Sequence, residues 1–252
     1  MIISPFSILI TSISSISWGV FDGIRKHLIQ RLNHWTLLLY LSLLFSTSFL
    51  IWIVLTNSFE LDSGYYLYGF ITIVLNFFAN YFYIKAIEVS DISSVVPFLA
   101  FTSLFTALSS YLVLGEQLAK IQILGIFVVV ISSFFINYKS GSSIKKLFKF
   151  NKGALLMILV SLLWAISAPF DKLAVTHSNA ISHSFIQSIF ISFLNLIMVL
   201  RFSKEKLFSD FLKAPRALIA GSIIASIALG LQFYAYTLMQ VSIFESLKRG
   251  LA

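Results

Sequence analysis

Eight stretches of at least 18 residues without Asp, Glu, Lys or Arg divide this chain; they span 1–21, 32–59, 63–84, 92–115, 121–138, 153–170, 173–200 and 217–244. A helix that crosses a bilayer needs about 20 mainly apolar residues, and each stretch reaches that scale. Lipid offers no partner to backbone N–H and C=O groups, so such segments form helices or a closed barrel. The alternation of apolar and polar residues that is typical of barrel strands is absent. The sequence therefore predicts an all-α fold, a polytopic membrane helix bundle.

The composition excludes a soluble domain and several kinds of site. Apolar residues make up 58% of the 252 residues and charged residues only 11%, against about 25% charged in ordinary soluble domains. The chain has no cysteine, which excludes disulfides and thiolate metal sites. Its net charge is +8, but the basic residues lie between apolar stretches. There we expect them to set membrane orientation rather than to bind nucleic acid.

We expect eight complete transmembrane helices and a partial ninth. The predicted spans are 4–28, 35–55, 64–86, 92–114, 120–138, 153–175, 181–201 and 216–238, followed by a shorter apolar segment from 241 to the end. Pro97 and Pro169 fall inside the fourth and sixth helices. Because proline lacks a backbone donor, it favours a bend at each of these positions.

Short motifs recur in the same order in the two halves of the chain. Trp18 and Lys26 lie eight residues apart late in the first helix, as do Trp164 and Lys172 late in the sixth. Further matched pairs are Phe82-Tyr83 with Phe233-Tyr234 and Val89-Ser90 with Val241-Ser242. Two blocks of five helices explain this order, as in transporters that are built from internal repeats.

The repeat predicts three parts: a five-helix block at 1–138, a basic linker at 139–152 and a second block at 153–252. In the first block, Val89-Ser90 is followed by a full helix, a turn at Gly115-Glu116 and another helix. In the second block, only ten residues follow Val241-Ser242. We therefore expect a ten-helix architecture that is truncated after the start of its ninth helix.

Several of these motifs resemble one known family. The segment 86–97 (AIEVSDISSVVP) is similar to the junction of helices 3 and 4 in EamA-type members of the drug/metabolite transporter superfamily. Leu114-Gly115-Glu116-Gln117, with Gln122 and Gly125 after it, resembles that family's Gly-Glu turn. Trp164 to Lys172 resembles its helix 6, and residues 246–249 (SLKR) the start of its helix 9. The resemblance covers nearly the whole chain. It implies ten helices in an inverted 5+5 repeat around a central cavity, through which metabolites or drugs move.

Polar side chains within the apolar spans are the candidates for a substrate site. Asn80 lies near the repeated Phe-Tyr motif of the third helix, and Gln232 and Tyr234 lie late in the eighth. These side chains can hydrogen-bond a solute, and we expect them to line a cavity. The alternative is that they join neighbouring helices, as polar groups in membranes often do.

Trp18 and Trp164 are candidates to stack on a ring-bearing solute, although tryptophan also anchors helices at the membrane interface. Asp22 and Asp171 follow these tryptophans by four and seven residues, which places them near the same helix face. We consider both as gating or coupling groups. The alternative is an ion pair with a neighbouring basic side chain at the interface.

Glu245, Lys248 and Arg249 are spaced i, i+3 and i+4, so they share one face of the ninth helix. One interpretation is a charged lining of the substrate path, with Lys248 as a binding group and Glu245 as a gating or coupling group. The other is an exposed tail whose charges meet water. The sequence leaves both open.

The function most favoured is a carrier of a small metabolite or drug-like solute that works by alternating access between the two repeats. The alternative is a non-transporting truncated remnant or a membrane scaffold. No catalytic residue, metal site or cofactor is expected, because the four histidines lack metal-ligand spacing and no Gly-rich phosphate loop or GxSxG motif occurs. The expected partners are a small-molecule substrate and the lipid bilayer of the plasma or bacterial inner membrane. A homo-oligomer is left open.

The basic residues predict an orientation that conflicts with the resemblance. They concentrate in three loops: Arg25, Lys26 and Arg31 in the first, Lys139, Lys145, Lys146, Lys149 and Lys152 in the linker, and Arg201, Lys204, Lys206, Lys213 and Arg216 near 201–216. By the positive-inside rule these loops are cytoplasmic and the N-terminus is outside. Relatives of the resembled family keep both ends in the cytoplasm. We give the charge count slightly more weight.

Overall fold

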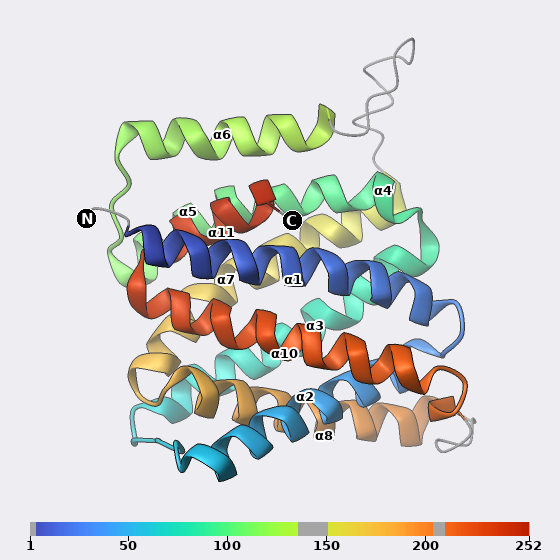
Figure 1. Ribbon diagram of the computed structural model, residues 1–252. Coiled ribbons are helices and arrows are strands. Elements are labelled where there is room, and N and C mark those ends of the chain that lie inside the picture. Colours follow the sequence, from blue (N-terminus) through green and yellow to red (C-terminus); the bar gives the residue numbers. More distant parts are fainter. Residues whose placement is uncertain (1–3, 136–150, 204–209, 252) are drawn as a thin grey trace.

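A computed structural model describes residues 4–135, 151–203 and 210–251, and most of these residues are helical (Figure 1). In chain order the helices are α1 (Pro5–Ile29), α2 (His34–Thr56), α3 (Tyr65–Val89), α4 (Ile92–Val95), η1 (Val96–Ala100), α5 (Phe101–Leu114), α6 (Lys120–Phe135), α7 (Lys152–Thr176), α8 (Ala180–Phe202), α10 (Pro215–Leu238) and α11 (Val241–Leu251). Within the described ranges, seven segments are long and apolar enough to cross a membrane. They are α1, α2, α3, the run from α4 to α5, α7, α8 and α10.

The prediction of an all-helical, membrane-spanning chain is confirmed, and most helix ends lie within a few residues of the predicted bounds. The shorter apolar helix is α6, which ends at Phe135. Residues 136–138 of its predicted span, and 139–150 of the predicted linker, lie outside the described residues. The predicted count of eight complete spans therefore stays a prediction.

Short polar side chains begin several of the helices. Ser4, Asn33, Asn151 and Asn179 each accept a hydrogen bond from a first-turn N–H of the helix that follows. Such caps satisfy backbone donors that have no partner inside the helix. Gly115 ends α5 with a φ of +66°, a left-handed conformation that glycine adopts at little cost. The chain then turns towards α6.

The predicted bend at Pro97 is a break in the helix. Pro97 lies in the 3₁₀ segment η1, which separates α4 from α5. Two carbonyls there accept hydrogen bonds from neighbouring helices: Ser133 Oγ of α6 donates to Pro97 O over 3.3 Å, and Ser161 Oγ of α7 donates to Phe98 O over 3.0 Å. Pro169, in contrast, lies within the continuous helix α7.

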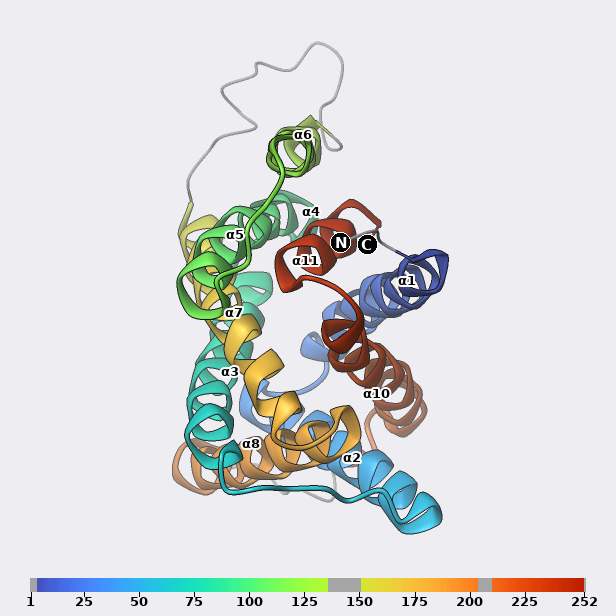
Figure 2. The same ribbon diagram turned by 90° about the vertical axis from the view of Figure 1, so that its left-hand side faces the viewer.

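The helices of the first half pack mainly against helices of the second half. α1 lies along α10, α2 along α8 and α3 along α7 (Figure 2). α5 packs on α7, and α11 packs on both α5 and α1. α6 contacts η1, α5 and α11 and lies at the edge of the bundle (Figure 1).

The exterior of the bundle is apolar, and polar groups lie inside it. Leu55, Ile121 and Leu200 are each more than 70% exposed, as expected for side chains that face lipid. Asp171 and Glu245 are at most 4% exposed. Because lipid is as apolar as leucine, large apolar side chains do not need burial there, whereas charged groups do.

Candidate functional site

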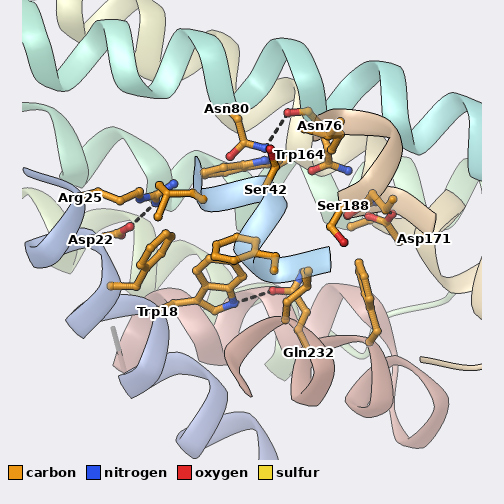
Figure 3. A pocket seen from close by; sticks show the side chains of 18 of the residues that line it. Trp18, Asp22, Arg25, Ser42, Asn76, Asn80, Trp164, Asp171, Ser188 and Gln232 are labelled. Carbon is orange, nitrogen blue, oxygen red and sulfur yellow. Dashed lines mark hydrogen bonds and ion pairs between the residues drawn. The ribbon is translucent and has the colours of Figure 1, made fainter. Parts of the chain in front are cut away.

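A cavity lies within the bundle, and side chains from α1, α2, α3, α7, α8, α10 and α11 line it (Figure 3). It offers about 120 Å³ to the centres of water-sized molecules. One buried water needs roughly 10–15 Å³ by the same measure. The cavity therefore has room for several waters or for a small solute in their place.

Eight of the nine sequence-predicted site residues line this cavity. They are Trp18, Asp22, Asn80, Trp164, Asp171, Gln232, Glu245 and Lys248. Tyr234 does not line it, and its side chain is 43% exposed. Tyr236, two residues later, lines the cavity and is fully buried. Because two helical positions differ by about 200°, the structure places Tyr236 at the cavity and Tyr234 on the opposite face of α10, which corrects the sequence-based placement.

Gln232 is the centre of a polar network on one side of the cavity. Its Oε1 accepts from Trp18 Nε1 over 2.9 Å and from Lys248 Nζ over 3.1 Å, while its Nε2 donates to Tyr236 Oη over 3.0 Å. Tyr236 Oη donates in turn to Glu245 Oε1 over 2.9 Å, and Lys248 Nζ donates to the same oxygen over 2.6 Å. The network joins α1, α10 and α11 through their side chains.

α11 turns its charged face into this network. Glu245 and Lys248 are 2% and 6% exposed, and Arg249 Nη2 lies 3.9 Å from Glu245 Oε2. The guanidinium of Arg249 also lies 5.6 Å from the centroid of the Trp164 ring. The i, i+3, i+4 spacing gives the three charges one helix face. In the structure that face lines the cavity and is not an exposed tail.

A second charged cluster lies on α1 and contains a residue that the sequence analysis counted as part of a loop. Arg25 forms an ion pair with Asp22, and its guanidinium lies 3.9 Å from the centroid of the Tyr83 ring and 4.6 Å from that of Phe21. Arg25 is 4% exposed and lines the cavity. Its i, i+3 spacing from Asp22 was the available sequence signal.

The carboxylate of Asp171 forms the third cluster. Its two oxygens accept hydrogen bonds from Ser167 Oγ over 3.0 Å, from His183 Nε2 over 3.0 Å and from Gln187 Nε2 over 2.9 Å. His183, one of the four histidines that lack metal-ligand spacing in the sequence, is fully buried. Asn76 of α3 donates to Ser167 Oγ over 2.7 Å and also lines the cavity.

Glu116, in the turn after α5, ties that turn to the start of α11. It accepts from Val241 N over 3.0 Å, from Ser242 N over 3.3 Å and from Ser242 Oγ over 3.0 Å. Lys172 Nζ lies 3.2 Å from Glu116 Oε1 and donates to Met239 O over 3.0 Å. This cluster connects α5, α7 and α11 at one end of the bundle.

A family model for EamA-like transporters matches residues 5–138 and 151–247. The chain belongs to the EamA-like transporter family. The resemblance seen in the sequence motifs is thereby confirmed. A solved crystal structure of another protein is similar over 97% of this chain and 94% of that chain, with a TM-score of 0.64 and 11% identity, which shows a shared fold. None of the curated proteins matches this chain.

As an EamA-like transporter with seven apolar spans in its described part, the protein is a multi-pass integral membrane transporter of the drug/metabolite kind. Members of the family are transporters rather than enzymes, which fits the expectation of no catalytic site. Among the described residues, no group of three His, Asp or Glu side chains is placed to hold a metal ion. The polar and aromatic groups at the cavity are of the kinds that line small-molecule sites in proteins generally.

Proposed function

We propose that this transporter is a carrier that binds a small polar or amphiphilic solute in the cavity between its two halves. Access to the cavity alternates between the two membrane faces as the halves rock against each other. The observation that carries this proposal is a cavity lined by matched residues of both halves. The bilayer is that of a plasma or bacterial inner membrane.

The packing of the helices supports a 5+5 repeat with blocks at 1–138 and 153–252. Exchanging α1 with α7, α2 with α8 and α3 with α10 converts the α1–α10 contact into the α3–α7 contact and leaves the α2–α8 contact unchanged. Exchanging α5 with α11 likewise relates the α5–α7 contact to the α1–α11 contact. A pattern of contacts that is unchanged by this exchange is expected for two repeats related by a pseudo-two-fold axis.

Matched residues occupy matched positions at the cavity. Trp164 follows Trp18 by 146 positions, and Asn80 and Gln232 each lie just before the repeated Phe-Tyr pair of their half. All four line the cavity. The repeat extends to a contact near one end of each half: Lys26 Nζ donates to Ile87 O over 2.7 Å, and the matched Lys172 donates to the matched Met239 O over 3.0 Å.

The lining limits the kind of solute. Three carboxylates and three basic groups face the cavity: Asp22, Asp171 and Glu245 against Arg25, Lys248 and Arg249. Because these formal charges balance, the site suits a solute that is neutral overall and carries polar or opposite charges. In the proposed site, Asn80, Gln232 and Lys248 bind the polar groups and the two tryptophans pack against the apolar part. Asp22, Asp171 and Glu245 act in gating or coupling.

Uptake into vesicles tests the proposal. The purified chain is reconstituted into liposomes and supplied with a panel of labelled zwitterionic, cationic, anionic and neutral solutes. For a solute that the wild type moves, Lys248→Ala and Gln232→Ala are expected to reduce uptake at low solute concentration by at least about tenfold, because a hydrogen bond to a charged group contributes about 1.5–3 kcal/mol.

Tyr234→Ala is the matched control, because this side chain lies on the same helix as Gln232 but faces away from the cavity. Its uptake should equal that of the wild type. Unchanged uptake in the Lys248 and Gln232 variants removes these residues from the site. Absence of uptake for the whole panel, with correctly folded protein, contradicts the carrier function.

A further inference from the structure

Three ionisable side chains from three helices meet beside the cavity. His183 of α8 lies between Asp171 of α7 and Tyr65 of α3: its Nε2 is 3.0 Å from Asp171 Oδ1, and its Nδ1 is 2.9 Å from Tyr65 Oη. The three are 0%, 4% and 3% exposed, respectively. Asp171 also lines the cavity (Figure 3), so the cluster reaches from the cavity wall into the protein.

The hydrogen bonds of the cluster define how its protons are arranged when the imidazole is neutral. The ionised Asp171 carboxylate only accepts, so His183 Nε2 carries the proton and donates it. His183 Nδ1 then accepts from the hydroxyl of Tyr65. Ser167 and Gln187 add two further donors to the carboxylate. In this state every group has its partner, and the cluster carries one negative charge.

Among the described residues, no lysine or arginine forms a direct ion pair with Asp171: Arg25 pairs with Asp22, and Lys248 and Arg249 with Glu245. Lys172 follows Asp171 in α7 but donates to Glu116 and to Met239 O. From α10, Tyr236 also lines the cavity, but its hydroxyl donates its hydrogen bond to Glu245 of α11.

One more proton makes the cluster neutral. Added to the ring, it converts His183 into an imidazolium beside the Asp171 carboxylate, and Tyr65 Oη then accepts from Nδ1. Because membrane interiors disfavour net charge, a single proton is the natural ligand of this cluster.

A metal cation fits the cluster less well than a proton does. Hard cations such as Na⁺ bind several oxygen ligands, whereas the neighbours of the Asp171 carboxylate here are N–H and O–H donors from Ser167, His183 and Gln187. In the described part of the chain, no third acidic or histidine side chain joins Asp171 and His183 to form a metal site.

We propose that Asp171, His183 and Tyr65 form a proton-binding site whose occupancy is linked to solute binding in the cavity. The link to solute rests on the proposed carrier function; proton binding itself does not. This site takes up one proton from water and later returns it to water, so no other reactant is needed. Since Asp171 lines the cavity, the charge of a bound solute changes the affinity of the site for its proton, and by reciprocity the proton changes the affinity for the solute.

Proton binding is tested first without any solute. The full chain, labelled with ¹⁵N-histidine, is placed in phosphatidylcholine nanodiscs, and the ring nitrogens are followed by NMR spectroscopy from about pH 5 to pH 8, where imidazoles titrate. The signals of His183 are assigned with His183→Gln. We expect His183 to gain its second ring proton within this range in the wild type. In Asp171→Asn, which lacks the carboxylate, it should not titrate over the same range.

An exposed pair of the same kind provides the control. Asp62 Oδ1 lies 3.0 Å from His177 Nδ1, and the two side chains are 60% and 36% exposed. The N–H of Gly64 and the His177 ring lower the pKa of Asp62. Asp62→Asn should alter the His177 signals and leave those of His183 unchanged. If Asp171→Asn does not fold, Tyr65→Phe removes only the hydroxyl and should still alter the Nδ1 signal of His183.

A His183 ring that keeps a single, unchanging proton state over the whole range, with or without Asp171, overturns the proposal. Transport is then measured separately, with a solute that the wild type moves in liposomes. Its uptake should change with pH, and this dependence should be lost in Asp171→Asn and in His183→Gln. A titrating His183 without uptake of any solute contradicts the carrier and leaves the proton site standing. If uptake does not depend on pH and the His183 ring signals do not change with pH, the carrier function stands and the proton-binding site is refuted.

Discussion

Glu245 and Lys248 place two opposite charges in direct contact at a depth where either charge alone is expensive. Glu245 Oε1 accepts from Lys248 Nζ over 2.6 Å and from Tyr236 Oη over 2.9 Å. A buried pair of this kind adds little net stability, because the cost of removing both charges from water offsets their attraction. Removing Lys248, however, leaves the buried Glu245 carboxylate with only the more distant Arg249, whose Nη2 lies 3.9 Å from Glu245 Oε2, to balance its charge.

Lys248→Met should therefore lower the free energy of unfolding by about 3–5 kcal/mol, the usual cost of breaking a buried ion pair. Glu245→Gln in the same chain should recover most of that loss, because the charge that was left behind is gone. Uptake of solute should stay low in both variants, since both lack the Lys248 ammonium. Thermal and denaturant unfolding in detergent measure the stability.

Lys85→Met is the comparison for this pair. Lys85 Nζ lies 2.8 Å from Glu88 Oε2, but Glu88 is 41% exposed, and exposed pairs of this kind contribute about 0–1 kcal/mol. An equal loss of stability in the single variant and in the double variant with Glu245→Gln would contradict a charge-based account of the first pair.

The sequence predicted most residues of the cavity because charged and amide groups are rare within apolar spans, and each one is conspicuous. It placed Tyr234 wrongly, because the repeated motif identifies the end of α10 as part of the site but does not indicate which face of that helix points to the cavity. His183 carries no sequence signal of its burial. That burial comes from other helices: Tyr65 Oη and Asp171 Oδ1 hydrogen-bond its ring, and the centroid of the Phe233 ring lies 4.6 Å from that of His183.

At the scale of elements, α11 depends on a carboxylate from another part of the chain. Glu116 is 9% exposed and accepts from two N–H groups in the first turn of α11. Glu116 therefore acts as an N-terminal cap of α11, a role that is usually filled by the residue directly before the helix. Its negative charge also interacts favourably with the positive end of the helix dipole.

Glu116→Ala is expected to lower the free energy of unfolding by about 1–2 kcal/mol, the cost of losing a helix cap. The amides of Val241 and Ser242 should then exchange with deuterium faster than in the wild type. Glu116→Gln keeps one oxygen acceptor and should show a smaller effect on both measurements. Unchanged exchange at both amides in the alanine variant would show that α11 begins independently of Glu116.

Helix bounds were predictable because charged residues bracket each apolar span at close to the thickness of a bilayer. The break between α4 and α5 was only partly predictable. Pro97 indicates a bend, but the length of the 3₁₀ segment depends on Ser133 and Ser161, which hydrogen-bond its carbonyls from other helices. No local pattern in the sequence reports such partners.

At the scale of the whole molecule, the helices alternate in direction, so the end of α1, the start of α7, the end of α8 and the start of α10 share one end of the bundle (Figure 1). Among the basic residues of the charge count, Lys139, Lys145, Lys146, Lys149, Lys204 and Lys206 lie outside the described residues. Arg25 lines the cavity, which removes one charge from the first loop. The remaining residues still favour this end as the cytoplasmic one.

The orientation is accessible to single-cysteine labelling, because the chain has no cysteine of its own. Gln30 and Ser63 are exposed residues at opposite ends of the bundle. In intact cells, a membrane-impermeant thiol reagent should label Ser63→Cys and leave Gln30→Cys unlabelled until the membrane is opened. The reverse pattern would instead agree with relatives that keep both ends in the cytoplasm.

The pairing of α1 with α10, α2 with α8 and α3 with α7 also has a consequence for biogenesis. The ribosome delivers the first three helices to the bilayer well before any of their main partners has been made. The nascent chain must therefore hold three incompletely paired helices in lipid until α7, α8 and α10 arrive. Slower translation beyond residue 89 would lengthen that interval and increase the exposure of the unfinished protein to membrane proteases.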